Sequence, residues 1–317
     1  MKILVTGGSG FIGTRLIDDL LKENHNIKIF DKVTSKKYPK LVQIGDVRDE
    51  NTLIDACAGV DIIYNLAAEH ADDVTPKSLY ADVNIGGAKN VVAAAKANNV
   101  RKIVFTSSVA IYGLNRGAPD ESMAAQPFNE YGRTKHEAEI VFQEWAQENE
   151  ENSLTIVRPV VVFGEHNRGN VYNLIKQIAS GKFLMIGDGK NKKSMCYVGN
   201  ISAFLVSLVT AKRGVNIYNF AGKPDLSSKE IVEIIQDELG IKKKVLSAPY
   251  WLGLLGGYSF DILAKIIGKK LPISSIRIKK FTAETTVSTH RLFESGFQEP
   301  YSLEEGLRKM ISYEFKN

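Results

Sequence analysis

A tyrosine and a lysine four residues apart are the side chains in this sequence best suited to chemistry. Tyr131 and Lys135 stand in the segment Y-G-R-T-K, and at that spacing they share one face of a helix. A free tyrosine titrates near 10, too high for a base at neutral pH. An ammonium about 4–5 Å away contributes roughly 3–4 kcal/mol at an effective dielectric near 20, or about 2–3 pKa units. We therefore expect Lys135 to lower the pKa of Tyr131, so that the phenol can remove an alcohol proton.

A serine upstream adds a second hydroxyl to this pair. Ser108 follows the apolar run K-I-V-F-T (102–106), which predicts a strand that ends just before it. From there Ser108 can hydrogen-bond the same substrate oxygen as Tyr131. In isolation, a Y-x-x-x-K segment is most often an ordinary surface pair on a helix, so the rest of the chain must decide.

A glycine-rich turn near the start of the chain predicts what these side chains work with. Residues 2–6 (K-I-L-V-T) predict a buried strand, and Gly7, Gly10 and Gly13 follow it as G-x-x-G-x-x-G. In a dinucleotide site the first glycine makes the tight turn, the second admits the pyrophosphate and the third lets the helix pack on the strand. The helix expected at 11–23 offers its free N–H groups to the phosphates. The alternative is a glycine turn without a ligand.

An acidic residue after the next strand indicates which dinucleotide would bind. The run N-I-K-I-F (26–30) predicts a second strand, and Asp31 ends it. A carboxylate there accepts hydrogen bonds from the adenosine ribose hydroxyls and repels a 2′-phosphate, so we expect NAD as the cofactor. Lys32 leaves a strict preference against NADP open, and the alternative for Asp31 is a solvated loop residue. A dinucleotide turn upstream of Tyr131 and Lys135 predicts an enzyme that oxidises a hydroxyl group, permanently or transiently.

Strands and helices alternate along the first half of the chain, which predicts the frame that positions these groups. This alternation requires a parallel sheet with right-handed crossovers, hence an α/β, doubly wound Rossmann fold. Ligands of such folds bind at the carboxyl ends of the strands, where Gly7, Asp31, Asp46, Ala68, Ser108 and Pro159 all fall. We expect further strands at 40–44, 61–66 and 154–158, and helices at 52–58, 76–98 and 129–148.

Composition limits the class of protein. A chain of 317 residues, with 44% hydrophobic and 24% charged residues, fits one two-lobed globular enzyme. Two cysteines form neither a disulfide framework nor a metal cluster, and a net charge of +5 without interleaved aromatics does not favour nucleic acid. Neither a leader peptide nor an apolar run of the ~18 residues that a membrane span needs is expected. We therefore expect a cytoplasmic enzyme without a metal.

Seven segments together resemble the extended short-chain dehydrogenase/reductase family of sugar epimerases and dehydratases. They are T-G-G-S-G-F-I-G (6–13), Asp31, G-D-V-R-D (45–49), N-L-A-A (65–68), T-S-S-V-A-I-Y-G (106–113), Y-G-R-T-K (131–135) and R-P-V-V-V-F-G (158–164).

The resemblance implies roles for individual residues. The catalytic set would be Ser108, Tyr131 and Lys135. The cofactor would contact Gly7, Gly10, Phe11, Ile12, Gly13, Asp31, Asp46, Val47, Leu66, Ala67, Ala68, Asn84, Tyr131, Lys135 and Pro159, with Asp46 and Val47 beside the adenine. The substrate would contact Glu69, His70, Ser108, Arg168, Asn170, Val171 and Lys193. Residues 1–163, joined by about 196–222, would form the NAD-binding domain, and 164–317 mostly a smaller α/β substrate lobe.

Within that family, the sequence favours epimerisation over dehydration. Dehydratases carry an Asp-Glu pair just after the strand-end serine or threonine, and here Val109 and Ala110 hold that place. A 4-epimerase needs only reversible hydride transfer: Tyr131 takes the C4 hydroxyl proton, and hydride returns to the other face of a transient 4-keto sugar. Four segments (67–74, 168–183, 193–201 and 256–270) resemble bacterial 4-epimerases of N-acetylglucosamine linked to undecaprenyl diphosphate. Alternatives are a soluble UDP-sugar 4-epimerase, an NAD(P)H-dependent keto-sugar reductase and a non-catalytic dinucleotide sensor.

Two surfaces are expected to meet partners. Residues 249–273 join aromatic and aliphatic side chains to basic residues that continue to position 280, which is typical of a peripheral membrane contact or a polyprenyl groove. The alternative is a helix pair buried in the lobe or in a dimer. The resemblance implies a homodimer through the helices at 76–98 and 129–148.

Overall fold

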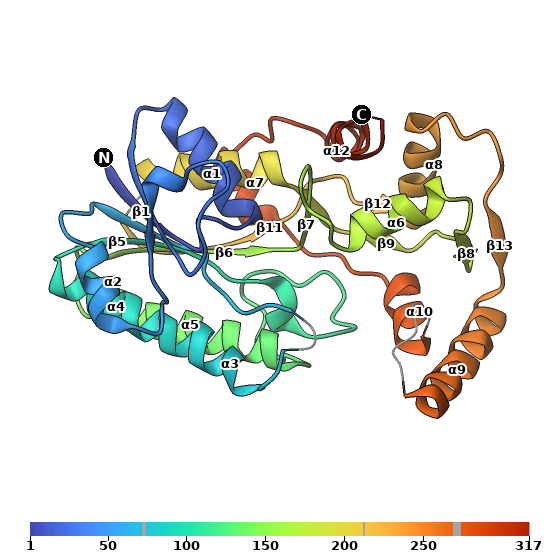
Figure 1. Cartoon of the computed structure of the whole chain (residues 1–317), viewed down its shortest axis with the longest axis horizontal. Helices are drawn as coiled ribbons and strands as arrows, with labels where there is room; N and C mark the ends of the chain where they lie inside the picture. Colours follow the sequence, from blue (N-terminus) through green and yellow to red (C-terminus); the bar gives the residue numbers. More distant parts are fainter. Residues whose placement is uncertain (72–73, 212, 269–273, 317) are drawn as a thin grey trace. The chain divides into compact units, whose positions relative to one another are not determined.

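The computed structural model describes residues 1–71, 74–211, 213–268 and 274–316. The chain divides into two compact units (Figure 1). The first comprises Met1–Val162, Cys196–Ala221 and Val287–Tyr301, and the second comprises Phe163–Met195, Gly222–Thr286 and Ser302–Asn317.

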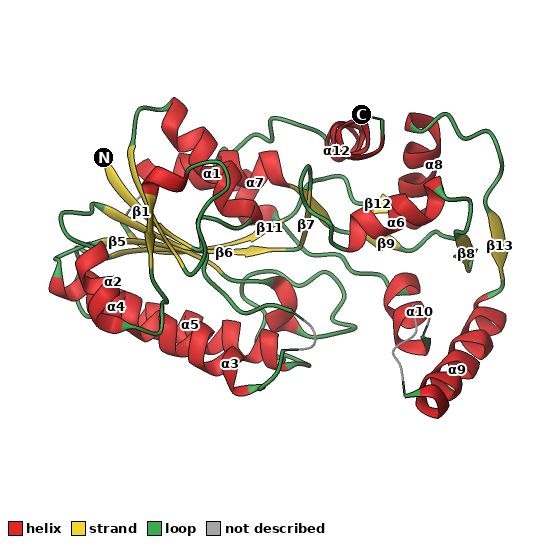
Figure 2. Ribbon diagram, in the orientation of Figure 1, coloured by secondary structure: helices red, strands yellow, loops and turns green. Residues whose placement is uncertain are grey.

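A seven-stranded sheet forms the centre of the first unit (Figure 2), with the order β11-β6-β5-β4-β1-β2-β3. All of its strand pairs are parallel, and from β3 to β6 the order is that of a Rossmann fold. The predicted doubly wound α/β class is therefore confirmed. The strands are β1 (Lys2–Thr6), β2 (Asn26–Asp31), β3 (Val42–Ile44), β4 (Ile62–Asn65), β5 (Lys102–Thr106), β6 (Ser153–Pro159) and β11 (Gly214–Phe220).

Helices cover both faces of this sheet (Figure 1), which explains why its strands are apolar runs rather than alternating ones. On one face, α1 (Phe11–Lys22) and α7 (Val198–Ser207) add Leu16, Ile17 and Phe204 to one buried cluster. On the other face, α2 (Glu50–Ala56), α4 (Gly87–Ala97) and α5 (Glu130–Gln147) add Leu53 and Phe142, among others, to a second cluster. The first unit also contains α3 (Ser78–Tyr80), α11 (His290–Glu294) and short turns η3 (Val109–Tyr112) and η4 (Leu208–Thr210).

Two predicted elements differ from the observed ones. The strand expected at 40–44 begins as a 3₁₀ turn, η1 (Pro39–Leu41), because Pro39 at its first position presets φ and cannot donate to a sheet. The helix expected at 76–98 is helical from Ser78 but contains a π-helical segment, η2 (Ala81–Gly86). Such π segments are rare and often mark functional positions, and this one carries Asn84.

Among its described residues, the second unit contains short strands and five helices, with β7 (Val161–Phe163) and β10 (Met195–Tyr197) at its boundaries. β8 (Leu184–Ile186) pairs with β13 (Leu246–Ala248), and β9 (Lys192–Lys193) pairs with β12 (Leu226–Ser227). The helices are α6 (Asn170–Ala179), α8 (Ser228–Glu238), α9 (Tyr250–Ile267), α10 (Ser275–Thr282) and α12 (Leu303–Phe315). Helices α8 and α12 each begin with a serine capping box. The N-cap serine hydroxyl accepts a hydrogen bond from the backbone N–H of the glutamate three residues later, and that glutamate's carboxylate accepts one from the backbone N–H of the serine.

Helix α9 is unusual because almost none of it is buried. Of its 18 residues only Gly257 is buried, although the helix is strongly apolar. One side packs on α10, where a Cβ at Gly257 would meet Ser275 at 2.9 Å and where the Ser275 N–H donates to Asp261 (3.2 Å). The outward side is a stripe of side chains that are each more than half exposed: Trp251, Leu255, Ile262 and Ile266. Even so, none of the helices within the described ranges has the length and apolarity needed to cross a bilayer.

Candidate active site

The glycine turn between β1 and α1 packs so closely on neighbouring backbone that side chains at Gly7 and Gly13 would not fit. Gly7 has φ +68°, and a Cβ on it would lie 2.7 Å from the backbone nitrogen of Ala67. A Cβ on Gly13 would lie 2.6 Å from the Cα of Gly8. Gly10 precedes α1 and has no side chain to cap its first N–H groups, so these remain available to an anion. The turn therefore fits a dinucleotide pyrophosphate.

The carboxylate of Asp31 is held beside this turn. It accepts hydrogen bonds from the backbone N–H groups of Ser9 (3.0 Å) and Val33 (3.2 Å), which fix its orientation at the end of β2. A carboxylate has about four acceptor positions, so two remain for the adenosine ribose.

After β3, Asp46 accepts two hydrogen bonds from the Arg48 side chain (3.0 and 2.7 Å), and these are the main reason that its pKa is lowered. Val47 next to it is buried.

Asn84 holds the loop that follows β4. Its side-chain oxygen accepts from the N–H of Glu69 (2.8 Å), and its amide donates to the carbonyl of Glu69 (3.1 Å) and to the Thr134 hydroxyl (2.9 Å). The loop contains the predicted cofactor residues Leu66, Ala67 and Ala68, and also His70, which is exposed. Asn84 thus acts on the predicted cofactor site through the loop, and its amide is already bound within the protein.

The tertiary structure brings Ser108 and Tyr131 together. Ser108 starts η3 directly after β5, and its hydroxyl accepts from the N–H of Ala110 (3.1 Å). Tyr131 lies in the first turn of α5, which begins there because the Asn129 side chain accepts from the N–H of Gly132. The Ser108 hydroxyl lies close enough to the Tyr131 phenol to lower its pKa. Lys135, one turn further, is only 2% exposed, and its Nζ lies 4.2 Å from the centre of the Phe105 ring.

The expected effect of Lys135 on Tyr131 is wrong for the chain on its own. Burial raises the pKa of Tyr131 above its usual value, and the hydrogen bond from Ser108 opposes this rise. Burial also lowers the pKa of Lys135 to about 7, while the carboxylate of Glu139 raises it. The prediction counted the attraction between phenolate and ammonium but not the loss of water around both groups.

The substrate residues predicted beyond position 163 lie in the second unit and have partners there. Arg168 is largely exposed, with its guanidinium 3.6 Å from Glu314 and over the ring of Tyr172. Asn170 and Val171 start α6. The Nζ of Lys193 donates to the carbonyls of Lys280 (3.0 Å) and Ala283, at the end of α10. Burial lowers the pKa of Lys193 to about 8, and Glu284 opposes the change.

Several polar residues near the catalytic set were missed in the sequence. Glu139 and Arg158 form a buried ion pair on α5 and β6, and Tyr112 and Asn219 join it. A signal for Glu139 was present, because it stands one helical turn after Lys135 in an otherwise buried stripe. Its partner on β6 has no such signal, since the pairing depends on how α5 crosses the sheet.

Comparisons with known proteins agree with this geometry. Residues 3–221 match the model of the "NAD dependent epimerase/dehydratase family". The chain is 51% identical over 316 residues to the N-acetyl-alpha-D-glucosaminyl-diphospho-ditrans,octacis-undecaprenol 4-epimerase of Escherichia coli O157:H7, covering 99% of this chain and 95% of the relative.

Two solved structures share the fold at low sequence identity. One is a UDP-N-acetylglucosamine 4-epimerase from Bacillus cereus (TM-score 0.78, 17% identity, 98% of each chain covered). The other is the UDP-glucose 4-epimerase of Thermus thermophilus in complex with NAD (TM-score 0.76, 21% identity, 99% of this chain and 98% of that chain covered).

The cofactor prediction is confirmed, because NAD stands in the description of the matching family. The residues of this chain fit NAD, since both the glycine turn with Gly7, Gly10 and Gly13 and the oriented Asp31 carboxylate are present. With a family model that spans most of the chain and a relative at 51% identity, the chain belongs to the NAD dependent epimerase/dehydratase family.

Proposed function

We propose that the protein is a 4-epimerase of a diphosphate-linked N-acetylhexosamine, interconverting the GlcNAc and GalNAc forms. We infer undecaprenyl diphosphate as the carrier, and surface polysaccharide or O-antigen synthesis as the purpose. The observation that carries the proposal is the 51% identity, over 99% of the chain, to a relative named for this reaction. The neighbouring hydroxyls of Ser108 and Tyr131, with Lys135 one turn further along α5, support it.

Each of these side chains has a part in the reaction. NAD, when bound, supplies reversible hydride exchange at C4 of the sugar. The Tyr131 oxygen takes the proton of the C4 hydroxyl and gives it back after the keto sugar has turned over. Ser108 hydrogen-bonds the same sugar oxygen, and the charge of Lys135 favours the phenolate. At the start of η3 stand Val109 and Ala110, neither of which can supply the acid and base of a dehydration.

The remaining predicted residues are assigned by the same proposal. We assign the sugar to Glu69 and His70, and the diphosphate to the start of α6 and to Lys193. Helix α6 begins with free N–H groups, since Gly169 has no side chain to cap it, and this end of a helix suits an anion. Residues 1–163 with about 196–222 would hold NAD, and most of 164–317 would hold the substrate.

The decisive experiment offers the purified protein two substrates in parallel. One is undecaprenyl-diphosphate-linked N-acetylglucosamine and the other is UDP-N-acetylglucosamine, and the C4 configuration of each product is determined. Conversion of the lipid-linked sugar, with little conversion of the nucleotide sugar, is the expected result. Conversion of the UDP-sugar alone would favour the soluble 4-epimerase, and conversion of neither would contradict the proposal.

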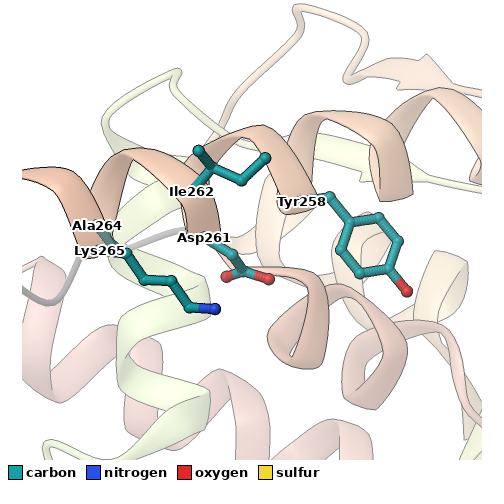
Figure 3. Close-up of a pocket in the computed structure, with 5 residues that line it drawn as sticks. All are labelled: Tyr258, Asp261, Ile262, Ala264 and Lys265. Atoms are coloured by element: carbon teal, nitrogen blue, oxygen red, sulfur yellow. The ribbon is translucent and has the colours of Figure 1, made fainter.

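A membrane-bound substrate needs the enzyme at a membrane, and we propose that α9 makes a peripheral contact with anionic lipid. Its outward stripe has no protein partner within the described residues, and a helix that is apolar on all sides is normally covered. An open pocket on α9 is lined by apolar, aromatic, cationic and anionic side chains (Figure 3): Tyr258, Asp261, Ile262, Ala264 and Lys265.

Basic residues beside this stripe favour anionic lipid over a second protein as its partner. Lys265 is exposed on α9, and α10 adds Arg277, Lys279 and Lys280 beside it. Cations flanking an apolar helix suit anionic headgroups. Of the predicted patch at 249–280, residues 269–273 lie outside the described residues. We therefore place the enzyme in the cytoplasm, peripherally at the inner face of the cytoplasmic membrane.

We also propose a homodimer through the helical segment of α3, η2 and α4, together with α5. The support is that these helices pack side by side in the first unit and that Ile140 on α5 is exposed.

A further inference from the structure

A buried ion pair lies under the catalytic helix and has no part in the reaction proposed above. The carboxylate of Glu139 is 0% exposed, and both of its oxygens accept hydrogen bonds from Arg158. The distances are 2.9 Å from Nε and 2.6 Å from Nη2, the two-point geometry of a strong charge-assisted pair. The Arg158 side chain is 7% exposed.

The same guanidinium reaches the element that carries Ser108. Its Nη1 donates to the Tyr112 oxygen (2.7 Å) and to the carbonyl of Glu121 (3.3 Å). Tyr112 belongs to η3, the short turn that Ser108 begins. Arg158 therefore links α5, with Tyr131 and Lys135, to η3.

The network is complete on its far side as well. The Tyr112 hydroxyl donates to the side-chain oxygen of Asn219 (2.7 Å), and the Asn219 N–H donates to the Glu121 carboxylate (2.7 Å). The Asn219 amide donates to the carbonyls of Pro119 and Ser288 (3.1 Å each). A buried network whose members are all satisfied is rigid, so small displacements of η3 against α5 are resisted.

Charge gives the pair a second effect. Glu139 stands one turn after Lys135 on α5, just as Lys135 stands one turn after Tyr131. Burial pushes Lys135 toward its neutral form, and Glu139 is the neighbour that opposes this. A buried carboxylate without a partner would take up a proton. Arg158 therefore compensates the buried charge of Glu139, and Glu139 in turn favours the charged Lys135.

We propose that Glu139, paired with Arg158, is a positioning residue for the epimerase: it favours the charged Lys135 and fixes the Tyr131 helix against the Ser108 turn. This inference rests on the proposed function. The titratable and charged groups packed around Lys135 and its network are Tyr131 and Glu139 on α5, Arg158 on β6, Tyr112 on η3, Glu121 in the loop before α5 and Arg291 on α11, which pairs with Glu121.

A purely structural ion pair is the competing explanation. Such pairs can often be replaced by neutral or apolar side chains without loss of the fold. The two explanations differ in what happens to the ionisation of Lys135, so the test must read ionisation and catalysis together with stability.

The first variant is Glu139→Gln, which removes the negative charge but keeps the shape. Because Glu139 no longer stabilises the Lys135 ammonium, the alkaline limb of the pH profile of kcat should shift to a pH about one unit lower. At pH 8 this shift lowers kcat roughly tenfold. KM should stay within about twofold, because the sugar is not contacted. In a Lys135→Met background the same substitution should change kcat less than about twofold, since the group it acts through is gone. An equal loss in both backgrounds would overturn the proposal.

Two further variants guard against a folding artefact. The double variant Glu139→Gln/Arg158→Met removes both members of the ion pair, so neither is left without its partner; it should fold, as circular dichroism checks, and still show the shifted limb. The control variant Arg308→Met/Glu238→Gln removes an ion pair between α12 and α8 and should leave the limb in place. A wild-type profile in the double variant, or unfolding of both Glu139 variants, would overturn the proposal.

A readout without sugar separates this inference from the proposed function. The ionisation of Lys135 is followed over a pH titration from the NMR signal of its ¹³C-labelled ε-carbon, which is assigned as the signal missing in Lys135→Met. Glu139→Gln should move this titration to lower pH, because the carboxylate that favours the ammonium is gone. An unchanged titration overturns the inference even if the enzyme is an epimerase. A shifted titration supports it even if neither sugar is turned over.

Discussion

At the scale of single residues, the chemistry of this protein depends on two hydroxyls in contact and one buried amine. Ser108 and Tyr131 come from different elements and meet at the carboxyl end of the sheet. Lys135 lies behind them with its ammonium over Phe105. Burial disfavours both the phenolate and the ammonium, so the charges that catalysis needs must be supplied by neighbours.

Removing one oxygen tests the proposed base. Tyr131→Phe should lower turnover by about 10²–10⁴-fold, the usual contribution of one acid–base group, because the phenol oxygen is the proposed base. NAD should stay bound, because the glycine turn and Asp31 are untouched. Product configuration at C4 and the NAD content of the purified protein measure the two effects. Tyr313→Phe, on the surface of α12, is the control, and normal turnover in Tyr131→Phe would end the proposed mechanism.

Two glycines with the same backbone angle test the phosphate cradle. Gly7 and Gly117 both have φ +68°, but a Cβ on Gly7 would meet the backbone at 2.7 Å while nothing lies within 4 Å of one on Gly117. Gly117→Ala should cost about 1 kcal/mol of the unfolding free energy, from backbone strain alone. Gly7→Ala should cost roughly 1–3 kcal/mol more and abolish NAD binding. Thermal unfolding and titration calorimetry with NAD measure both, and equal behaviour of the two variants would contradict the cradle.

At the scale of elements, two helical arrangements in the second unit contrast. Helices α8 and α12 each bury an apolar stripe and are joined by ion pairs, as Arg308 and Lys316 both contact Glu238. Helix α9 leaves its apolar stripe outward. The fold alone explains the first arrangement, whereas the exposed stripe of α9 is the basis of the proposed lipid contact.

The carboxylate that joins α8 to α12 predicts a pH dependence of stability. Hydrogen bonds from Lys316, Arg308 and Ser312 lower the pKa of Glu238 to about 2, with Lys316 contributing most. A depressed pKa in the folded state means that the stabilisation is complete above the ordinary value near 4.5 and is lost as pH falls through about 2. Glu238→Gln should therefore cost about 1–2 kcal/mol at pH 7 and progressively less below pH 4.5. Denaturant unfolding at a series of pH values from 7 to below 4.5 measures this loss of unfolding free energy. The control is Glu151→Gln, which removes the exposed ion pair with Arg101.

The outward stripe of α9 predicts binding to lipid vesicles. Leu255→Glu/Ile262→Glu places two charges in the stripe and should reduce co-sedimentation with phosphatidylglycerol vesicles more than about tenfold, since each buried aliphatic contributes roughly 1.5–3 kcal/mol. Its thermal stability should be unchanged, because neither side chain is buried. Val215→Glu, exposed on β11, is the control. If the double variant instead alters only the oligomeric state, the stripe is a protein interface.

At the scale of the whole molecule, the proposal assigns cofactor and chemistry to the sheet-centred unit and the diphosphate to the other. An epimerase of this kind is redox-neutral, since the hydride removed from the sugar returns to it. The chemistry of one turnover therefore leaves the nicotinamide as it began, which distinguishes an epimerase from a reductase.

Cofactor stoichiometry tests that property. The purified protein should interconvert its sugar without added NAD or NADH, and nicotinamide absorbance should not change over many turnovers. A reductase would consume one reduced nicotinamide for each product. Binding of NAD without any turnover would instead indicate the non-catalytic sensor.

The sequence by itself determined whatever depends on neighbours along the chain. The strand runs, the glycine turn with Asp31, and the shared helix face of Tyr131 and Lys135 are set by residues within a few turns of one another. The fold class and the family followed from these local signals, because a dinucleotide turn and alternating strands and helices admit few topologies.

Only the tertiary structure decided how distant segments share charges and hydrogen bonds. The contact of Ser108 with Tyr131, the pairing of Glu139 with Arg158 and the engagement of Lys193 by α10 each join residues far apart in the chain. The rise in the Tyr131 pKa had the same origin, since burial is a property of the packed molecule. Spacing along a chain gives the separation of charges on one helix, but the water lost around them depends on everything that packs against it.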